Sequence, residues 1–79
     1  MKVQVKLLGT YRRHLPADAQ GPAYDLELPT ATAVEDLLAQ LPVPTLEGCV
    51  VLVNGRTPTD GQVLQEGDTL AIFPAMAGG

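Results

Sequence analysis

The chain has 79 residues and a mass of 8.3 kDa, which is room for one small domain and excludes an enzyme built from two domains. Five Lys and Arg against nine Asp and Glu give a net charge of −4, so phosphate backbones and anionic lipid are repelled, and neither nucleic acid nor a membrane surface is expected as a partner. Hydrophobic residues make up 46% of the chain but aromatic residues only 4%, which predicts an aliphatic core.

The first half of the chain predicts a β-hairpin with a long connection. Residues 2–7 alternate between apolar and polar side chains, the period of a half-buried strand. Residues 9–22 show no period and are expected to form a surface connection longer than a usual hairpin loop. Alternation returns at residues 24–28, and Pro29 ends this second strand because proline has no N–H to give to a sheet.

A short helix is expected next. Thr32 and Glu35 have the spacing of a capping box, which predicts the helix start. Four apolar side chains then follow at helical spacing and should pack on the sheet: Val34, Leu37, Leu38 and Leu41. Pro42 disfavours further helix, so the helix is expected to end near Gln40 or Leu41, about nine residues from its start.

The second half predicts two more strands and several turns. Residues 49–53 are a continuous apolar run, which indicates a central strand buried on both faces. Turns are expected at residues 54–55 and 66–68, where Asn and Gly tolerate a positive φ. A final strand is expected over residues 69–73 before Pro74, and a further short strand is possible near residues 62–64.

The order β-β-α-β-β predicts an α+β fold with one helix on one face of a mixed sheet of four to five strands, and the β-grasp arrangement fits this order. We expect a domain over residues 1–74 and a flexible C-terminal tail over residues 75–79.

Cysteine and metal chemistry offer little. A lone Cys49 excludes an internal disulfide, and with a lone His14 it is too little for a structural zinc site, so no metal is expected. The beginning of the chain alternates charged and apolar residues and lacks the apolar core of a signal peptide, so we expect a cytoplasmic protein.

The sequence contains no GxGxxG, P-loop, HExxH or CxxC motif, so an ordinary enzyme active site is not expected. The remaining candidates for chemistry are the last five residues, which are Ala75, Met76, Ala77, Gly78 and Gly79. Glycine lacks a Cβ, so such an arm can pass through a narrow channel in a partner. Its terminal carboxylate is an inert anion at neutral pH, so reaction with a nucleophile requires activation, for example by adenylation. A frayed terminus would look the same by composition alone.

Longer stretches carry a family resemblance. They are the first strand, Val34–Leu38, Val51–Arg56, Glu66–Pro74 and the terminal Gly78-Gly79. Through them nearly the whole chain resembles the ThiS/MoaD family of ubiquitin-like β-grasp sulfur carriers.

The resemblance implies a carrier and not an enzyme. A ubiquitin-activating-enzyme-like adenylyltransferase would adenylate the carboxylate of Gly79 with MgATP, and sulfur from a persulfide donor would replace AMP to give a thiocarboxylate. The carrier itself would bind no cofactor. Gly78 and the preceding tail residues would enter a partner's channel, Phe73 and Pro74 would lie where partners dock, and a larger synthase subunit would receive the sulfur.

Several branches stay open. The long connection over residues 9–22 resembles the small subunit of molybdopterin synthase, which favours molybdenum cofactor biosynthesis, although those members often carry a second proline at the position of Ala75. A thiamine-pathway (thiazole) carrier is the nearest alternative, and tungsten cofactor, cysteine and tRNA thiolation pathways use related carriers. A ubiquitin-like protein modifier that joins lysine, and a plain binding module with an idle tail, belong to other classes.

Three further features have ordinary explanations. Cys49 is expected to be a buried, inert thiol and not a sulfur relay. The basic cluster over residues 12–14 is expected to be a solvated surface. Six acidic residues could form a docking face, or serve solubility alone: Asp25, Glu27, Glu35, Asp36, Glu66 and Asp68.

Overall fold

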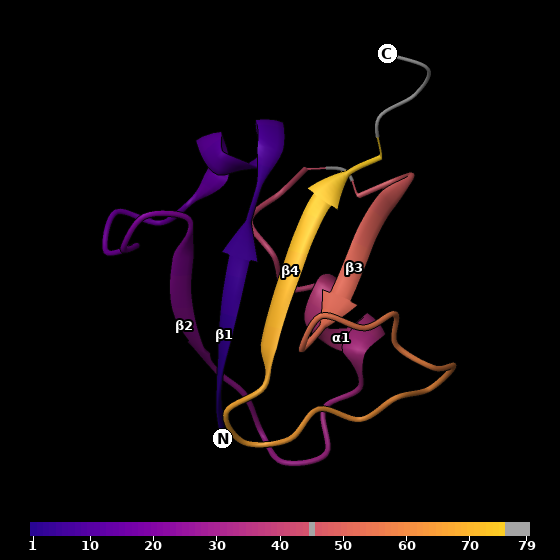
Figure 1. The fold of residues 1–79 in the computed structure, drawn as a ribbon. Helices are drawn as coiled ribbons and strands as arrows, with labels where there is room; N and C mark the ends of the chain where they lie inside the picture. The colour runs from indigo at the N-terminus through magenta and orange to yellow at the C-terminus, as the bar shows by residue number, and fades with distance from the viewer. Residues whose placement is uncertain (45, 76–79) are drawn as a thin grey trace.

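The computed structural model describes residues 1–44 and 46–75, which form one mixed β-sheet with a helix behind it (Figure 1). The strands are β1 (Lys2–Leu7), β2 (Ala23–Glu27), β3 (Cys49–Val53) and β4 (Thr69–Pro74). Their order is β2-β1-β4-β3, with β1 and β4 parallel at the centre and the outer pairs antiparallel. The sheet has four strands, so the expected α+β architecture is confirmed.

The core lies between the sheet and the helix, as the alternation of β1 predicts. Val3, Val5 and Leu7 are almost fully buried, and Leu70 and Ile72 of β4 lie beside them on the same face. The helix α1 (Val34–Leu38) closes this face with Val34 and Leu37. The other face carries the polar side chains of β1 and is not covered by α1 (Figure 1).

The strand predicted over residues 2–7 is confirmed at both ends, whereas β2 begins one residue earlier than expected and ends one earlier. Leu28 follows β2, is buried, and donates its N–H to the Met1 carbonyl at 2.7 Å. The N-terminal ammonium in turn donates to the Leu28 carbonyl at 2.6 Å. This reciprocal pair extends the β1–β2 ladder past the last residue of β2.

The helix start was predicted wrongly. Ala33 is the N-cap and makes no side-chain capping bond, while the Thr32 hydroxyl donates to the Pro29 carbonyl at 2.7 Å. The entrance to the helix is instead held by an isolated bridge between Ala33 and Val63, in which the Val34 N–H donates to the Gln62 carbonyl. The capping box is therefore absent: the Thr32 hydroxyl bonds Pro29, and the hydrogen bonds that join this segment to the neighbouring loop are made by the Val34 N–H and the Thr32 carbonyl.

The helix is also shorter than predicted. After Leu38 the chain continues in tight turns, in which the N–H groups of Gln40 and Leu41 donate to the carbonyls three residues earlier. Leu41 is nevertheless buried. Helical spacing thus marks the side chains that face the core, but it does not separate an α-helix from the 3-10 type turns that follow it.

The connection over residues 9–22 is more ordered than a surface loop. It begins with the 3-10 helix η1 (Gly9–His14), whose Tyr11 is buried in the core. A six-residue 3-10 helix has no 3.6-residue period, so the sequence pattern gives no sign of it.

A strand spans residues 49–53 as expected, but its predicted position at the centre of the sheet was wrong. β3 lies at the edge of the sheet and only Val53 is buried, while the other four residues are half-buried. The turns at residues 54–55 and 66–68 are confirmed, with positive φ at Asn54, Gly55 and Gly67. Residues 62–64 contribute only the isolated bridge and no strand.

Candidate functional site: the end of β4 and the open face of the sheet

The last described residues leave the sheet beside β3. Pro74 is opposite Cys49 in the register, and the Ala75 N–H donates to the Gly48 carbonyl at 3.3 Å. The β3–β4 ladder thus holds the chain as far as Ala75.

Gly9 supports this exit from the side of β1. Its φ is +58°, a conformation that L side chains rarely adopt, and a Cβ placed there would lie 3.1 Å from Pro74 Cδ. The neighbouring Leu8 N–H donates to the Ile72 carbonyl at 2.9 Å. Glycine at position 9 therefore lets the start of η1 pack directly against Pro74.

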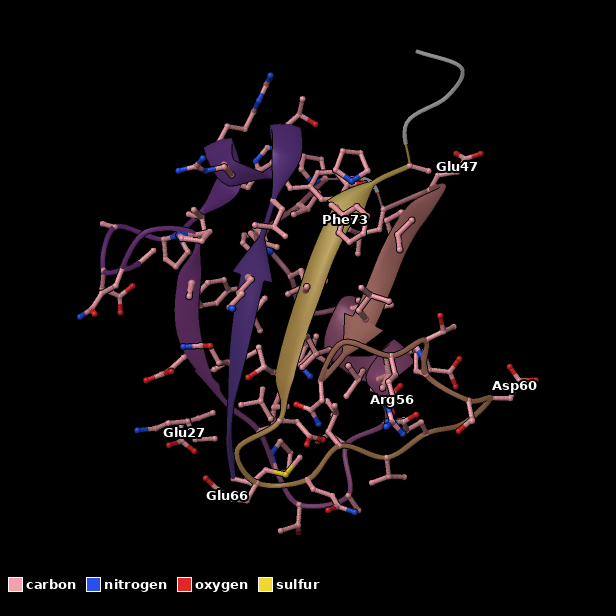
Figure 2. The ribbon with its side chains drawn as sticks, viewed as in Figure 1. Glu27, Glu47, Arg56, Asp60, Glu66 and Phe73 are labelled. Atoms are coloured by element: carbon pink, nitrogen blue, oxygen red, sulfur yellow. The ribbon has the colours of Figure 1, made fainter. Side chains whose placement is uncertain are left out.

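A shallow apolar depression of about 370 Å³ lies at this end of the molecule, lined by Leu8, Gly9, Phe73 and Pro74. Figure 2 shows Phe73 on the sheet near the end of β4. The sequence pointed to Phe73 and Pro74 but not to Leu8 and Gly9. The structure brings all four residues together. The available signal was a glycine two residues after the end of the alternating strand.

The depression continues into a wider apolar surface on the open face of the sheet. Val50 is opposite Phe73 and Leu52 is opposite Ala71, so these four side chains share the face that α1 does not cover. All four are half-buried. The sequence missed this surface because β3 was expected to be buried on both faces. We call the set Leu8, Val50, Leu52, Ala71 and Phe73 the open-face patch.

The remaining tail residues in the prediction are Met76, Ala77, Gly78 and Gly79, and they lie outside the described residues. Ala75 is the only described member of the tail, and it is exposed.

The charged candidates do not gather at one place. Asp25 and Glu27 of β2 lie on the open face, whereas Glu35 and Asp36 lie on α1 behind the sheet. Glu66 and Asp68 serve the turn before β4, where Glu66 accepts from the Lys2 N–H and Asp68 from Asn54 and Gln65. A single acidic docking face is therefore not formed.

The basic residues lie in the last turn of η1, with Arg12 and Arg13 exposed and His14 half-buried. Cys49 is a free, half-buried thiol at the start of β3, less buried than expected. Within residues 1–44 and 46–75, no group of three or more His, Cys, Asp and Glu could hold a metal ion, and no helix is long and apolar enough to cross a membrane.

Comparison with known proteins places the chain in a family. The model of the ThiS family matches residues 5–79. A protein from Pyrococcus furiosus provisionally assigned as molybdopterin converting factor, subunit 1, has 25% sequence identity and a TM-score of 0.73, with 95% of this chain and 98% of that chain covered. SAMP1 from Haloferax volcanii has 22% identity and a TM-score of 0.72 over the whole of both chains. No curated protein matches the sequence.

The chain belongs to the ThiS family, since the match covers nearly all of it. Its class is that of the small ubiquitin-like sulfur carriers, which are not enzymes, and its fold is the β-grasp that both structural neighbours share. The resemblance inferred from the sequence is thereby confirmed.

Proposed function

We propose that the chain carries sulfur as a thiocarboxylate on Gly79 and delivers it to a larger synthase subunit in molybdopterin biosynthesis. The observation that carries this proposal is the family match, which runs to residue 79 and so includes the terminal Gly78-Gly79. The Pyrococcus furiosus neighbour supports the branch, because its name is that of a molybdopterin converting factor subunit. The larger subunit and cytoplasmic action belong to the same proposal.

The chemistry takes three steps. A carboxylate oxygen of Gly79 attacks the α-phosphorus of MgATP in an adenylyltransferase partner, and pyrophosphate leaves. A persulfide anion from the sulfur donor then attacks the acyl carbon and AMP departs. A thiol cleaves the resulting acyl disulfide, taking one sulfur into a new disulfide and leaving the other on Gly79. ATP and persulfide are consumed by the partners, and the carrier binds neither as a resident cofactor.

The tail and the surface beside it have different roles in this proposal. The tail would enter the partner, where small residues at positions 75, 77, 78 and 79 leave the channel unobstructed. Pro74 and the open-face patch, which includes Phe73, would make the apolar docking contact, because removing their exposed apolar area from water stabilises a complex.

Deletion of Gly79 tests the activation step. We expect the shortened chain to support no ATP–pyrophosphate exchange with the activating enzyme purified from the source, while its urea unfolding stays unchanged. The Ala77→Gly variant is the matched control, since it keeps the tail's length and should retain exchange. Exchange at the normal rate without Gly79 would contradict the proposal.

A further inference from the structure

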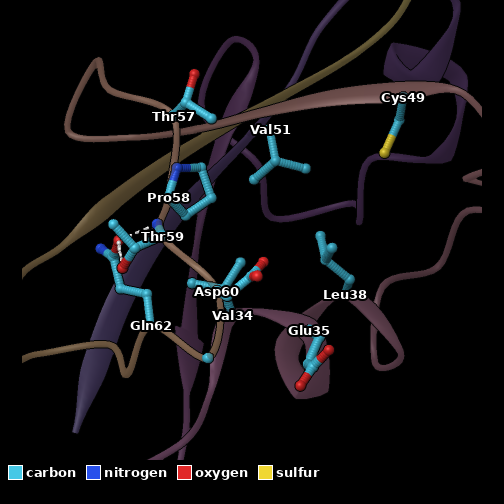
Figure 3. A pocket seen from close by; sticks show the side chains of 11 residues that line it. Val34, Glu35, Leu38, Cys49, Val51, Thr57, Pro58, Thr59, Asp60 and Gln62 are labelled. Atoms are coloured by element: carbon cyan, nitrogen blue, oxygen red, sulfur yellow. Dashed lines mark hydrogen bonds between the residues drawn. The ribbon is translucent and has the colours of Figure 1, made fainter.

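A second surface lies on the helix side of β3, away from the open-face patch. There a groove of about 340 Å³ runs between β3, α1 and the loop over residues 57–62. Cys49 and Val51 line it from the strand, and Val34 and Leu38 from the helix (Figure 3). Successive side chains of β3 point to opposite faces, so this groove and the open-face patch use different residues of the same strand.

The backbone of β3 is available along this groove. The Asn54 N–H donates to the Thr69 carbonyl, and the Ala75 N–H donates to the Gly48 carbonyl. The backbone N–H and C=O groups of the even-numbered residues of β3 therefore point toward β4. The backbone N–H and C=O groups of the odd-numbered residues therefore point away from β4, toward the open edge of the sheet. The Cys49 N–H donates to the Leu46 carbonyl, and the N–H and C=O of Val53 both bond the backbone of Arg56 in the turn. The N–H and C=O of Val51 remain directed outward, as the edge of a sheet that can accept another strand.

The rim of the groove is acidic. Glu35 of α1 and Asp60 of the loop are both exposed, and both line the groove (Figure 3). No ion pair with either carboxylate is found among the described residues. Negative charge at this rim disfavours a second copy of the chain, because each copy carries a net charge of −4 and would bring its own Glu35 and Asp60. It favours a cationic occupant.

We infer that this groove binds an extended, basic segment of a partner protein by strand addition to β3. Directly opposed residues of paired strands share a face, so the residue opposite Val51 places its side chain in the groove and uses its own N–H and C=O on Val51. Residues two positions before and after it point the same way and reach the rim. The segment is therefore Lys-x-Val-x-Lys in type, with arginine and other aliphatic residues equivalent.

This inference concerns docking and does not depend on the chemistry of the tail. Because the groove and the open-face patch lie on opposite faces of β3, the carrier can be held at the groove while another protein covers the patch. Binding at the groove should thus be the same with and without Gly79.

The test uses the full chain and an acetylated, amidated heptapeptide, Thr-Lys-Thr-Val-Thr-Lys-Thr, titrated at low salt and followed by backbone amide shifts. We expect saturable shifts at Val51, Leu38 and Gly61. The same peptide with glutamate in place of lysine should bind at least about tenfold more weakly, because its charges meet Glu35 and Asp60. A peptide N-methylated on its central valine should not bind, because it lacks the N–H that strand addition requires.

Matched variants separate local charge from net charge. Glu35→Lys with Asp60→Lys should weaken the lysine peptide about tenfold, whereas Asp18→Lys with Asp25→Lys, which changes the net charge equally, should change binding less than about twofold. Equal weakening by both pairs, unchanged binding of the N-methylated peptide, shifts centred on Leu52 and Phe73, or a peptide-independent dimer that covers Val51 would each overturn the inference. Loss of binding on deletion of Gly79 would assign the peptide to the tail instead.

Discussion

At the scale of single residues, Gly9 has two separate reasons to be glycine. Its φ is +58°, and it lies against the ring of Pro74 where the chain leaves the sheet. Gly61 shares the first reason, with a φ of +71°, but a Cβ there would meet no atom within 4 Å. The pair therefore separates the conformational cost of a side chain from the cost of a close contact.

We expect Gly61→Ala to lower the free energy of unfolding by about 1 kcal/mol, the cost of a left-handed conformation for an L residue. Gly9→Ala should cost at least about 1 kcal/mol more, because Pro74 or the start of η1 must also move. Urea unfolding of the two variants measures the difference. Equal losses would mean that the contact with Pro74 relaxes freely and does not fix the tail's exit.

Tyr24 gives a prediction about pH. Burial on the core side of β2 raises the pKa of its phenol above the usual value of 10.0, because the charged form is poorly solvated there. The folded state thus holds its proton to higher pH than the unfolded state does. The resulting contribution to stability is complete below pH 10.0 and is lost as the pH rises through the folded-state value.

The measurement is urea unfolding between neutral pH and about pH 11, where the reference phenol is ionised. We expect the free energy of unfolding to fall above the usual pKa of the phenol, and the Tyr24→Phe variant to show a smaller fall because it has no proton to lose. Tyr11→Phe serves as the comparison at the other tyrosine. An identical fall in the wild type and in Tyr24→Phe would contradict this account.

At the scale of elements, the start of α1 depends on bonds from outside the helix. The Thr32 hydroxyl donates to the Pro29 carbonyl, and the bridge between Ala33 and Val63 joins the start of the helix to the neighbouring loop. Glu35 is exposed and has no capping role.

Thr32→Val should therefore cost about 1 kcal/mol of stability, because it removes a hydrogen bond at a buried position. Glu35→Ala should cost less than about 0.5 kcal/mol, since it removes only an exposed charge in the first turn. Thermal unfolding of the two variants tests this order. A capping box would instead make the two losses similar, and that result would show that Glu35 does bond the helix start.

The elements also show what the sequence could and could not predict. The alternation of residues 2–7 fixes both the strand and its buried face, because one face meets water and the other meets α1. The apolar run of β3, unlike the alternation of residues 2–7, does not reveal where the strand lies in the sheet. The side chains of Val50 and Leu52 belong to the open-face patch, and those of the odd-numbered residues point to the side of α1. Neither face of the strand therefore carries a polar residue, although the strand lies at the edge. Hydrophobic patterning alone does not distinguish a strand buried inside the domain from an edge strand whose apolar faces could bind a partner.

At the scale of the whole molecule, the two ends of the sheet have different roles in this account. The end of β4 directs the tail and carries the open-face patch beside it, while the opposite end is closed by the turn before β4, in which Glu66 and Asp68 bond the backbone. Figure 1 shows the N-terminus at that opposite end. The candidate residues Phe73 and Pro74 were predicted from the family resemblance, whereas Leu8, Gly9 and the open face became candidates only once the strand register was known.

The patch makes a prediction about partners. Phe73→Ala should slow activation by the adenylyltransferase by at least about tenfold, because a half-buried aromatic side chain at the tail's exit is the kind of residue that dominates an interface. Its cost in stability should be small beside that of Ile72→Ala, which empties a fully buried site and should cost about 3 kcal/mol. Activation rates compared at equal folded fraction measure the effect, and an unchanged rate in Phe73→Ala would remove the patch from the docking surface.

The function proposed for the whole molecule is to carry sulfur on Gly79. The most direct measurement is the intact mass of the protein after incubation with MgATP, a persulfide donor and extract of the source cells, followed by fragmentation of the C-terminal peptide. We expect one oxygen to be replaced by one sulfur, the change to lie on Gly79, and the change to disappear without ATP. An unmodified mass in the presence of active adenylyltransferase would contradict the claim, and an isopeptide bond to lysine would show that the chain is a protein modifier instead.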